Sequence, residues 1–191
     1  MFGQTHFEPW QGDQYGKSSP RLLVIGESRF DEEYTDKTII QDLMNGYQHR
    51  TFTNFVQAAT GTRCSERDYD ASRFWKSVVF YNYNTTFFPG DARLPLPWSE
   101  RNREENARLL REVLLKWTPS HAIVWGMSNW CSLRVEGAEW IDKKAISGMA
   151  DPHRCVTLKS VPTLFARTSH PSWPGFSYDR WAPMLKAFLA M

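Results

Sequence analysis

Three short segments of this sequence carry side chains that could bind and act on a planar polar ring. The segment Gly26-Glu27-Ser28 supplies a carboxylate, and Asp31 follows soon after it. Asn82 and Asn84 supply two amides, which project to the same side wherever the chain is extended. His170 begins the run His-Pro-Ser and supplies an imidazole. Together these groups could hold the polar edge of a ring and move protons or stabilise charge on it.

The elements that must position these side chains are four predicted β-strands. Short apolar runs typical of buried strands occupy residues 21–25, 77–82, 122–125 and 163–167. We expect Gly26 to end the first strand and Gly126 to end the third. The three segments stand at the ends of the first, second and fourth runs.

Helical patterns separate these strands. The predicted helices cover residues 37–45 with Asp36 as N-cap, 52–59 before Gly61, 100–117 with Ser99 as N-cap, and a last stretch after Pro183. Alternating strands and helices predict an α/β fold, namely a three-layer α/β/α sandwich with a central, mainly parallel four-stranded sheet. Ligand sites in such sheets gather at the carboxyl ends of the strands, where the three segments lie.

Length and composition favour one domain. The 191 residues are 41% hydrophobic and 15% aromatic, enough for a single core over residues 21–191 behind a polar N-terminal arm, residues 1–20. No apolar run is long enough to span a membrane, and the first residues do not resemble a signal peptide. Cys64, Cys131 and Cys155 are widely spaced, which predicts free, buried thiols rather than disulfides or a metal site.

The net charge of +2 is too small to indicate a nucleic-acid partner by itself. Residues 143–191 are more basic, with seven lysines and arginines against two aspartates. Such a region could lie along a phosphate backbone, or it could be an ordinary solvated face.

The order of the motifs resembles the uracil-DNA glycosylase superfamily. Gly26-Glu27-Ser28 is similar to the family's first motif, which varies around Gly-Gln-Asp-Pro-Tyr-His and Gly-Glu-Ala-Pro-Gly. His170-Pro171-Ser172 matches the second motif, His-Pro-Ser, and Asn82 stands on the strand that carries the family's base-recognising asparagine. Trp125-Gly126 matches the third strand and turn, so the resemblance spans roughly residues 21–190.

The resemblance implies a role for each candidate residue. Asn82 would read the edge of a flipped uracil, His170 would stabilise the departing base, and Glu27, helped by Asp31, would stabilise the sugar cation or position water. Gly26 and Ser28 would line the base site, with Phe30 against C5 of the base and Tyr47, or else Phe52, stacked on it. The residues that would contact DNA, including a wedge into the duplex, are Ser172, Trp173, Pro174 and Phe176.

The expected protein is therefore a monomeric, cytoplasmic enzyme, nucleoid-associated if bacterial, that removes uracil from DNA without a metal or other cofactor. Ser28 stands where the best-known subfamily has an aspartate, and Arg29 replaces the motif's proline. The subfamilies with Gly-Glu-Ala-Pro-Gly hold an iron–sulfur cluster with four cysteines, which three dispersed cysteines cannot reproduce. Two other functions stay open: an inactive reader of uracil-containing or damaged DNA, and a hydrolase of free nucleosides. Each candidate side chain also has a structural interpretation, as a surface carboxylate, a turn histidine, a strand-end amide or a core aromatic.

Overall fold

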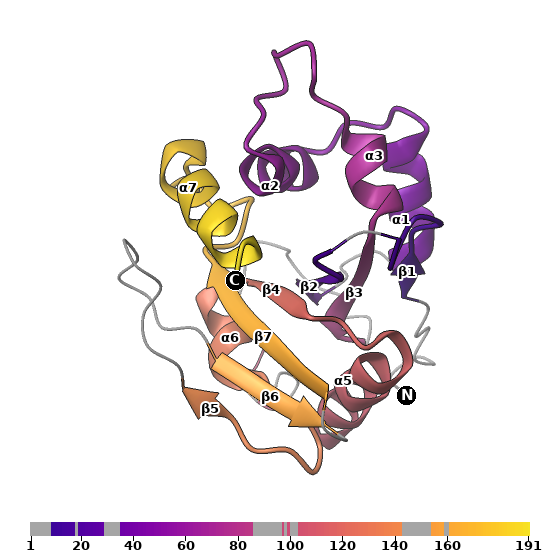
Figure 1. The fold of residues 1–191 in the computed structure, drawn as a ribbon, viewed down its shortest axis with the longest axis vertical. Coiled ribbons are helices and arrows are strands. Elements are labelled where there is room, and N and C mark those ends of the chain that lie inside the picture. The colour runs from indigo at the N-terminus through magenta and orange to yellow at the C-terminus, as the bar shows by residue number, and fades with distance from the viewer. Residues whose placement is uncertain are drawn as a thin grey trace.

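The computed structural model describes residues 9–17, 19–28, 35–85, 97, 99, 103–142, 154–158 and 161–191. In this part of the chain the strands form one sheet of seven, ordered β1-β3-β2-β4-β7-β6-β5 (Figure 1). The strands are β1 Trp10–Gln11, β2 Leu22–Ser28, β3 Val78–Asn84, β4 His121–Trp125, β5 Ile141–Asp142, β6 Arg154–Leu158 and β7 Val161–Thr168. The helices are α1 Asp36–Met44, α2 Arg50–Thr60, α3 Ala71–Lys76, α5 Glu104–Trp117, α6 Met127–Ser132 and α7 Tyr178–Leu189.

The α/β class is confirmed, and the four predicted strands are the four adjacent central ones. Strands β3, β2, β4 and β7 run parallel to one another. The predicted strand count and the mainly parallel sheet are wrong, because β1, β6 and β5 extend the sheet with antiparallel pairs. Strand β1 comes from the predicted N-terminal arm, and Trp10 donates its indole N–H to the carbonyl of Trp75 at 2.8 Å. That part of the arm is therefore attached to the sheet.

The side chains of the central strands alternate between two apolar cores. Val24, Phe80 and Trp125 belong to the face that packs against α1, α2, α3 and α7. Ile25, Tyr81 and Val124 belong to the opposite face, where α5 and α6 pack. Because both faces of the parallel strands are covered, these strands are apolar along nearly their whole length, which is the signal that predicted them.

Several predicted element ends are corrected. Gly26 does not stop β2, which continues to Ser28. The N-cap of α1 is Thr35, whose hydroxyl accepts from the Thr38 N–H, whereas Asp36 is the first helical residue. Helix α5 has Arg103 rather than Ser99 as its N-cap.

The last helix and two cysteines also differ from expectation. Helix α7 starts at Tyr178, five residues before Pro183, so Pro183 lies inside the helix and lacks the N–H that would donate to the Asp179 carbonyl. The predicted burial of Cys64 and Cys131 is wrong, because both are exposed. Among the described residues, no helix has the length and apolar character needed to cross a membrane.

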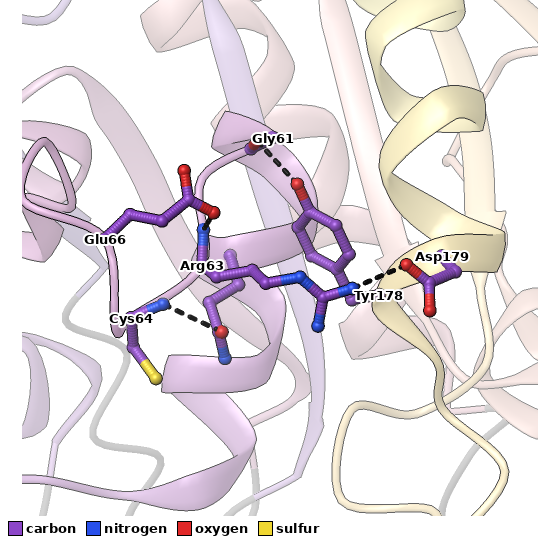
Figure 2. A network of polar contacts seen from close by, with 7 residues as sticks. Gly61, Arg63, Cys64, Glu66, Tyr178 and Asp179 are labelled. Atoms are coloured by element: carbon purple, nitrogen blue, oxygen red, sulfur yellow. Dashed lines mark hydrogen bonds and ion pairs between the residues drawn. The ribbon is translucent and has the colours of Figure 1, made fainter.

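A polar cluster ties the end of α2 to the start of α7, as Figure 2 shows. The Tyr178 hydroxyl donates to the Gly61 carbonyl at 2.6 Å. Arg63 pairs with Asp179 at 2.6 Å and lies over the Tyr178 ring, 4.3 Å from its centroid. An exposed ion pair of this kind adds only about 0–1 kcal/mol. The cluster holds the start of α7 against the end of α2, and α7 directly follows the loop that contains His170.

Candidate functional site

The carboxyl ends of the parallel strands gather the residues that the motifs single out. Since β2, β3, β4 and β7 run the same way, Glu27, Asn82, Gly126 and His170 lie at one end of the sheet. The register places Gly26 opposite Asn82 on the neighbouring strand. We call these five residues the strand-end site.

Glu27 and His170 approach each other over Gly126. A β-carbon built on Gly126 would lie 3.7 Å from Glu27 Oε2 and 3.7 Å from the β-carbon of His170. Glu27 Oε2 and the β-carbon of His170 are therefore no farther apart than twice 3.7 Å. Gly126 has φ of +87°, a conformation that other residues rarely adopt, so the turn that brings the groups together favours glycine.

Hydrogen bonds from two elements, β3 and α6, fix Glu27 and the residue before it. The Ser128 hydroxyl donates to Glu27 Oε1 at 2.9 Å, and Asn84 Nδ2 donates to the Glu27 carbonyl at 2.6 Å. Asn129 Nδ2 donates to the Gly26 carbonyl at 3.0 Å. Sequence reasoning missed Ser128 and Asn129, although they follow the third strand just as Glu27 ends the first.

The two strand-end amides serve different neighbours. Asn84 is oriented by Asn106 of α5, whose Nδ2 donates to Asn84 Oδ1 at 3.1 Å. Asn82 instead contacts Asp36 of α1 through its side chain and its backbone. The two amides thus have different partners: Asn84 supports the backbone of Glu27, and Asn82 is the amide of the strand-end site.

His170 is held as a neutral imidazole with its proton on Nε2. Its Nδ1 accepts from the Ser172 N–H at 3.3 Å and lies 2.7 Å from the Ser172 hydroxyl. Because a backbone N–H only donates, Nδ1 must carry a lone pair, which leaves the proton of the neutral ring on Nε2. Burial, and secondarily repulsion from His49, lowers the pKa of His170 to about 4. At neutral pH the ring is thus an uncharged hydrogen-bond donor.

The loop that follows β7 is anchored on both sides. Asn54 of α2 donates to the Pro171 carbonyl at 2.9 Å, and the Trp181 indole of α7 donates to the Ser169 hydroxyl at 3.0 Å. The ring of Trp125 packs edge-on against His170, with centroids 6.0 Å apart. These contacts, together with the α2–α7 cluster of Figure 2, fix the imidazole from two helices and a strand.

Gly26 gives room to the Asn82 amide. A β-carbon on Gly26 would lie 2.2 Å from Asn82 Oδ1, far inside contact distance. The glycine is thus explained by the side chain that lies across it, and not by the end of a strand.

The aromatic side chains near α2 divide between surface and core. Tyr47, the first choice for stacking on a base, is 53% exposed. Phe52, the second choice, is buried with its ring against Trp75, Phe80 and Trp125, so it is a core aromatic. His49 lies between Tyr47 and Phe52 in the sequence. Its Nδ1 is buried without a hydrogen-bond partner, and burial lowers its pKa. Sequence reasoning gave His49 no role.

The loop over residues 172–176 presents one large aromatic outward. Trp173 is 65% exposed, and Ser172 and Pro174 beside it are exposed too. Phe176 turns inward and stacks on Trp181 with ring centroids 6.2 Å apart. Of the four residues expected to contact DNA, Phe176 is therefore a support for the loop, while Trp173 stands at its surface.

Three expectations fall partly or wholly outside the described residues. Phe30 and Asp31 lie wholly outside the described residues. Ser28 is described only through its backbone, which pairs with Asn84. Within the described residues, no three histidine, cysteine or acidic side chains cluster as a metal site would require.

Comparison with family models and with curated protein sequences yields no match to this chain.

Proposed function

We propose that this protein is a DNA glycosylase of the uracil-DNA glycosylase type, which hydrolyses the N-glycosidic bond of deoxyuridine flipped out of DNA. The observation that carries the proposal is a neutral imidazole donor, His170, next to the carboxylate of Glu27 at the ends of parallel strands. The three-layer sandwich that the sequence predicts is part of the proposal, and helices on both faces of the sheet support it.

The chemistry of the bond calls for these two groups. As the bond between C1′ and N1 breaks, its electron pair goes to the base and positive charge develops on the sugar. A donor aimed at the base oxygen stabilises the departing anion, and such donors are worth about 2.7–4 kcal/mol. Nε2–H of His170 supplies this donor without carrying a charge of its own.

Glu27 would serve the sugar side of the reaction. Its carboxylate would stabilise the positive charge on the sugar and orient a water molecule toward C1′. The water oxygen then bonds to C1′, a water proton passes to Glu27, and uracil leaves as an anion held by His170. The products are the free base and an abasic site.

The amide of Asn82 would identify the base. It offers a carbonyl oxygen and an N–H side by side, which complements N3–H and O4 of uracil. His49 is close enough to His170 to lower its pKa, and the Tyr47 ring lies 6.3 Å from the His49 ring. These two side chains are the candidates for contact with the face of the ring.

A DNA partner, rather than a free nucleoside, is supported by Trp173. An exposed tryptophan on a loop anchored by two helices has no role in binding a nucleoside alone, whereas it could fill the gap left by a flipped base. The proposed partner is uracil-containing DNA, bound by a monomer without a cofactor, in the cytoplasm.

The test is cleavage of labelled oligonucleotides that contain one uracil, followed by hot alkali. We expect alkali-labile breaks at uracil and none at thymine, with Glu27→Gln losing most of the activity. Glu139→Gln is the matched control, because Glu139 is exposed and belongs to none of the contacts that hold Glu27 or His170.

Two results would replace the proposal. Tight binding to uracil-containing DNA without any cleavage would indicate a reader. Release of uracil from free deoxyuridine, with no preference for DNA, would indicate a nucleoside hydrolase.

A further inference from the structure

The Asn82 amide is attached to a buried carboxylate. Asp36, the first residue of α1, accepts from Asn82 Nδ2 at 2.7 Å through Oδ1 and from the Asn82 N–H at 2.9 Å through Oδ2. Asp36 is 3% exposed and Asn82 is 9% exposed. Each carboxylate oxygen thus bonds to the same asparagine, so Asp36 is placed to orient Asn82 rather than to react.

A carboxylate can hold only one end of an amide. Its oxygens accept but do not donate, so the Nδ2 end of Asn82 must face Asp36. Rotating the amide by half a turn would place Oδ1 against the carboxylate and break a charge-assisted hydrogen bond in buried surroundings. On its other side Oδ1 lies over the α-carbon of Gly26, where a methyl group would not fit.

We propose that Asp36 is a specificity-determining positioning residue for the Asn82 amide. It locks the amide so that Oδ1 can accept from a ring N–H and Nδ2 can donate to the ring carbonyl beside it. This inference rests on the proposed function and names its substrate class. The selected edge is the lactam that deamination creates, as in uracil or hypoxanthine. Cytosine offers an unprotonated nitrogen beside an amine, and it would need the rotated amide that Asp36 forbids.

The variant that tests the lock is Asp36→Asn. The Asn82 backbone N–H only donates, so the oxygen of the new side chain must stay with it. The NH2 group of the new side chain then faces the Asn82 amide and favours the rotated orientation. Asp70→Asn is the matched control, because Asp70 also begins a helix, is exposed, and caps α3 by accepting from the Arg73 N–H at 2.8 Å. Asparagine caps a helix about as well as aspartate does.

Single-turnover cleavage of uracil- and cytosine-containing oligonucleotides measures discrimination. We expect Asp36→Asn to lower the uracil-to-cytosine rate ratio by about 10- to 100-fold, the worth of one hydrogen bond to a charged group. The Asp70→Asn ratio should match that of the unmodified protein. A folded Asp36→Asn protein with an unchanged ratio overturns the proposal.

A second measurement needs neither DNA nor a stable variant. In the nuclear magnetic resonance spectrum of the unmodified protein, the two Nδ2 protons of Asn82 should differ widely in shift and exchange at least about tenfold more slowly than those of exposed Asn45. Equal exchange at the two residues refutes the lock even if Asp36→Asn fails to fold. If the protein cleaves no uracil DNA but the protons are protected, the lock stands and the proposed function fails.

Discussion

Lowering the pH tests the neutral state of His170 most directly. The pKa of His170 is lowered to about 4 by burial and by His49, from a usual value of 6.5. At pH 5.5 an ordinary histidine is neutral in about one molecule in eleven, whereas a histidine with pKa of about 4 is neutral in roughly 97% of molecules. Protonation of Nδ1 would also break its bond with the Ser172 N–H. We therefore expect His170 to stay in its active form through pH 5.5.

The assay is single-turnover uracil excision between pH 7.5 and pH 4.5 at constant ionic strength. The rate should change less than about twofold down to pH 5.5, where an unshifted histidine would lower it roughly tenfold. A titration of the His170 ring by nuclear magnetic resonance assigns the midpoint to the residue. A His170 midpoint near 6.5, or a rate that falls in parallel with it, refutes the assignment of a neutral donor.

The same pKa shift makes the folded protein sensitive to acid. The pKa of His170 is lower in the folded state, so the unfolded chain takes up the proton first as the pH falls. The contribution of neutral His170 to the free energy of unfolding is therefore complete above pH 6.5 and is lost as the pH falls toward 4. The loss is on the order of 3 kcal/mol at most. Urea unfolding of His170→Asn should show a smaller drop in stability between pH 7 and pH 4.5 than the unmodified protein. At pH 7, His170→Ala should slow excision by about 10²–10³-fold with DNA affinity nearly unchanged.

Three further substitutions separate the parts of the strand-end site. Gly26→Ala should displace the Asn82 amide, lowering the free energy of unfolding by about 1–3 kcal/mol and the excision rate with it, and intact activity in this variant would contradict the contact at Oδ1. Ser128→Ala should remove the donor to Glu27 and slow excision by about tenfold without changing DNA affinity, as a binding titration would reveal. Trp173→Ala should weaken binding to a uracil-containing duplex by about 1–3 kcal/mol in fluorescence anisotropy, with thermal stability unchanged because the side chain is exposed. Equal affinity for the duplex would remove Trp173 from the DNA contact.

The central strands were predictable because their burial on both faces leaves a continuous apolar run. The runs before Glu27, Asn82, Gly126 and His170 became β2, β3, β4 and β7, and their parallel order places the side chains at one end. The antiparallel strands β1, β5 and β6 carry no such run. Strand β1 is only two residues long, and its pairing with β3 depends on contacts with the distant Trp75.

The supports of the site could not be predicted from local patterns. Asp36 stands where an N-cap is expected, yet Thr35 caps the helix. The Asp36 carboxylate instead accepts a hydrogen bond from Asn82, 46 residues along the chain. Gly26 has the position of a strand terminator, whereas its missing side chain makes room for the same asparagine. The first case depends on which helix packs against β3 and the second on which strand pairs with β2, and a local sequence pattern contains neither.

The charge state of His170 also decides what Glu27 can do. A protonated imidazole at the same end of the sheet would attract the Glu27 carboxylate, and the carboxylate would then have less charge to offer a sugar cation. Burial of His170 and the neighbouring His49 prevent this, because both disfavour the imidazolium. In the proposed reaction the ring donates Nε2–H toward a developing anion, while Glu27 keeps its charge for the opposite side of the breaking bond. An N-glycoside separates into an anion and a cation, so a neutral donor on the base side and a free carboxylate on the sugar side meet its needs better than two opposite charges that neutralise each other.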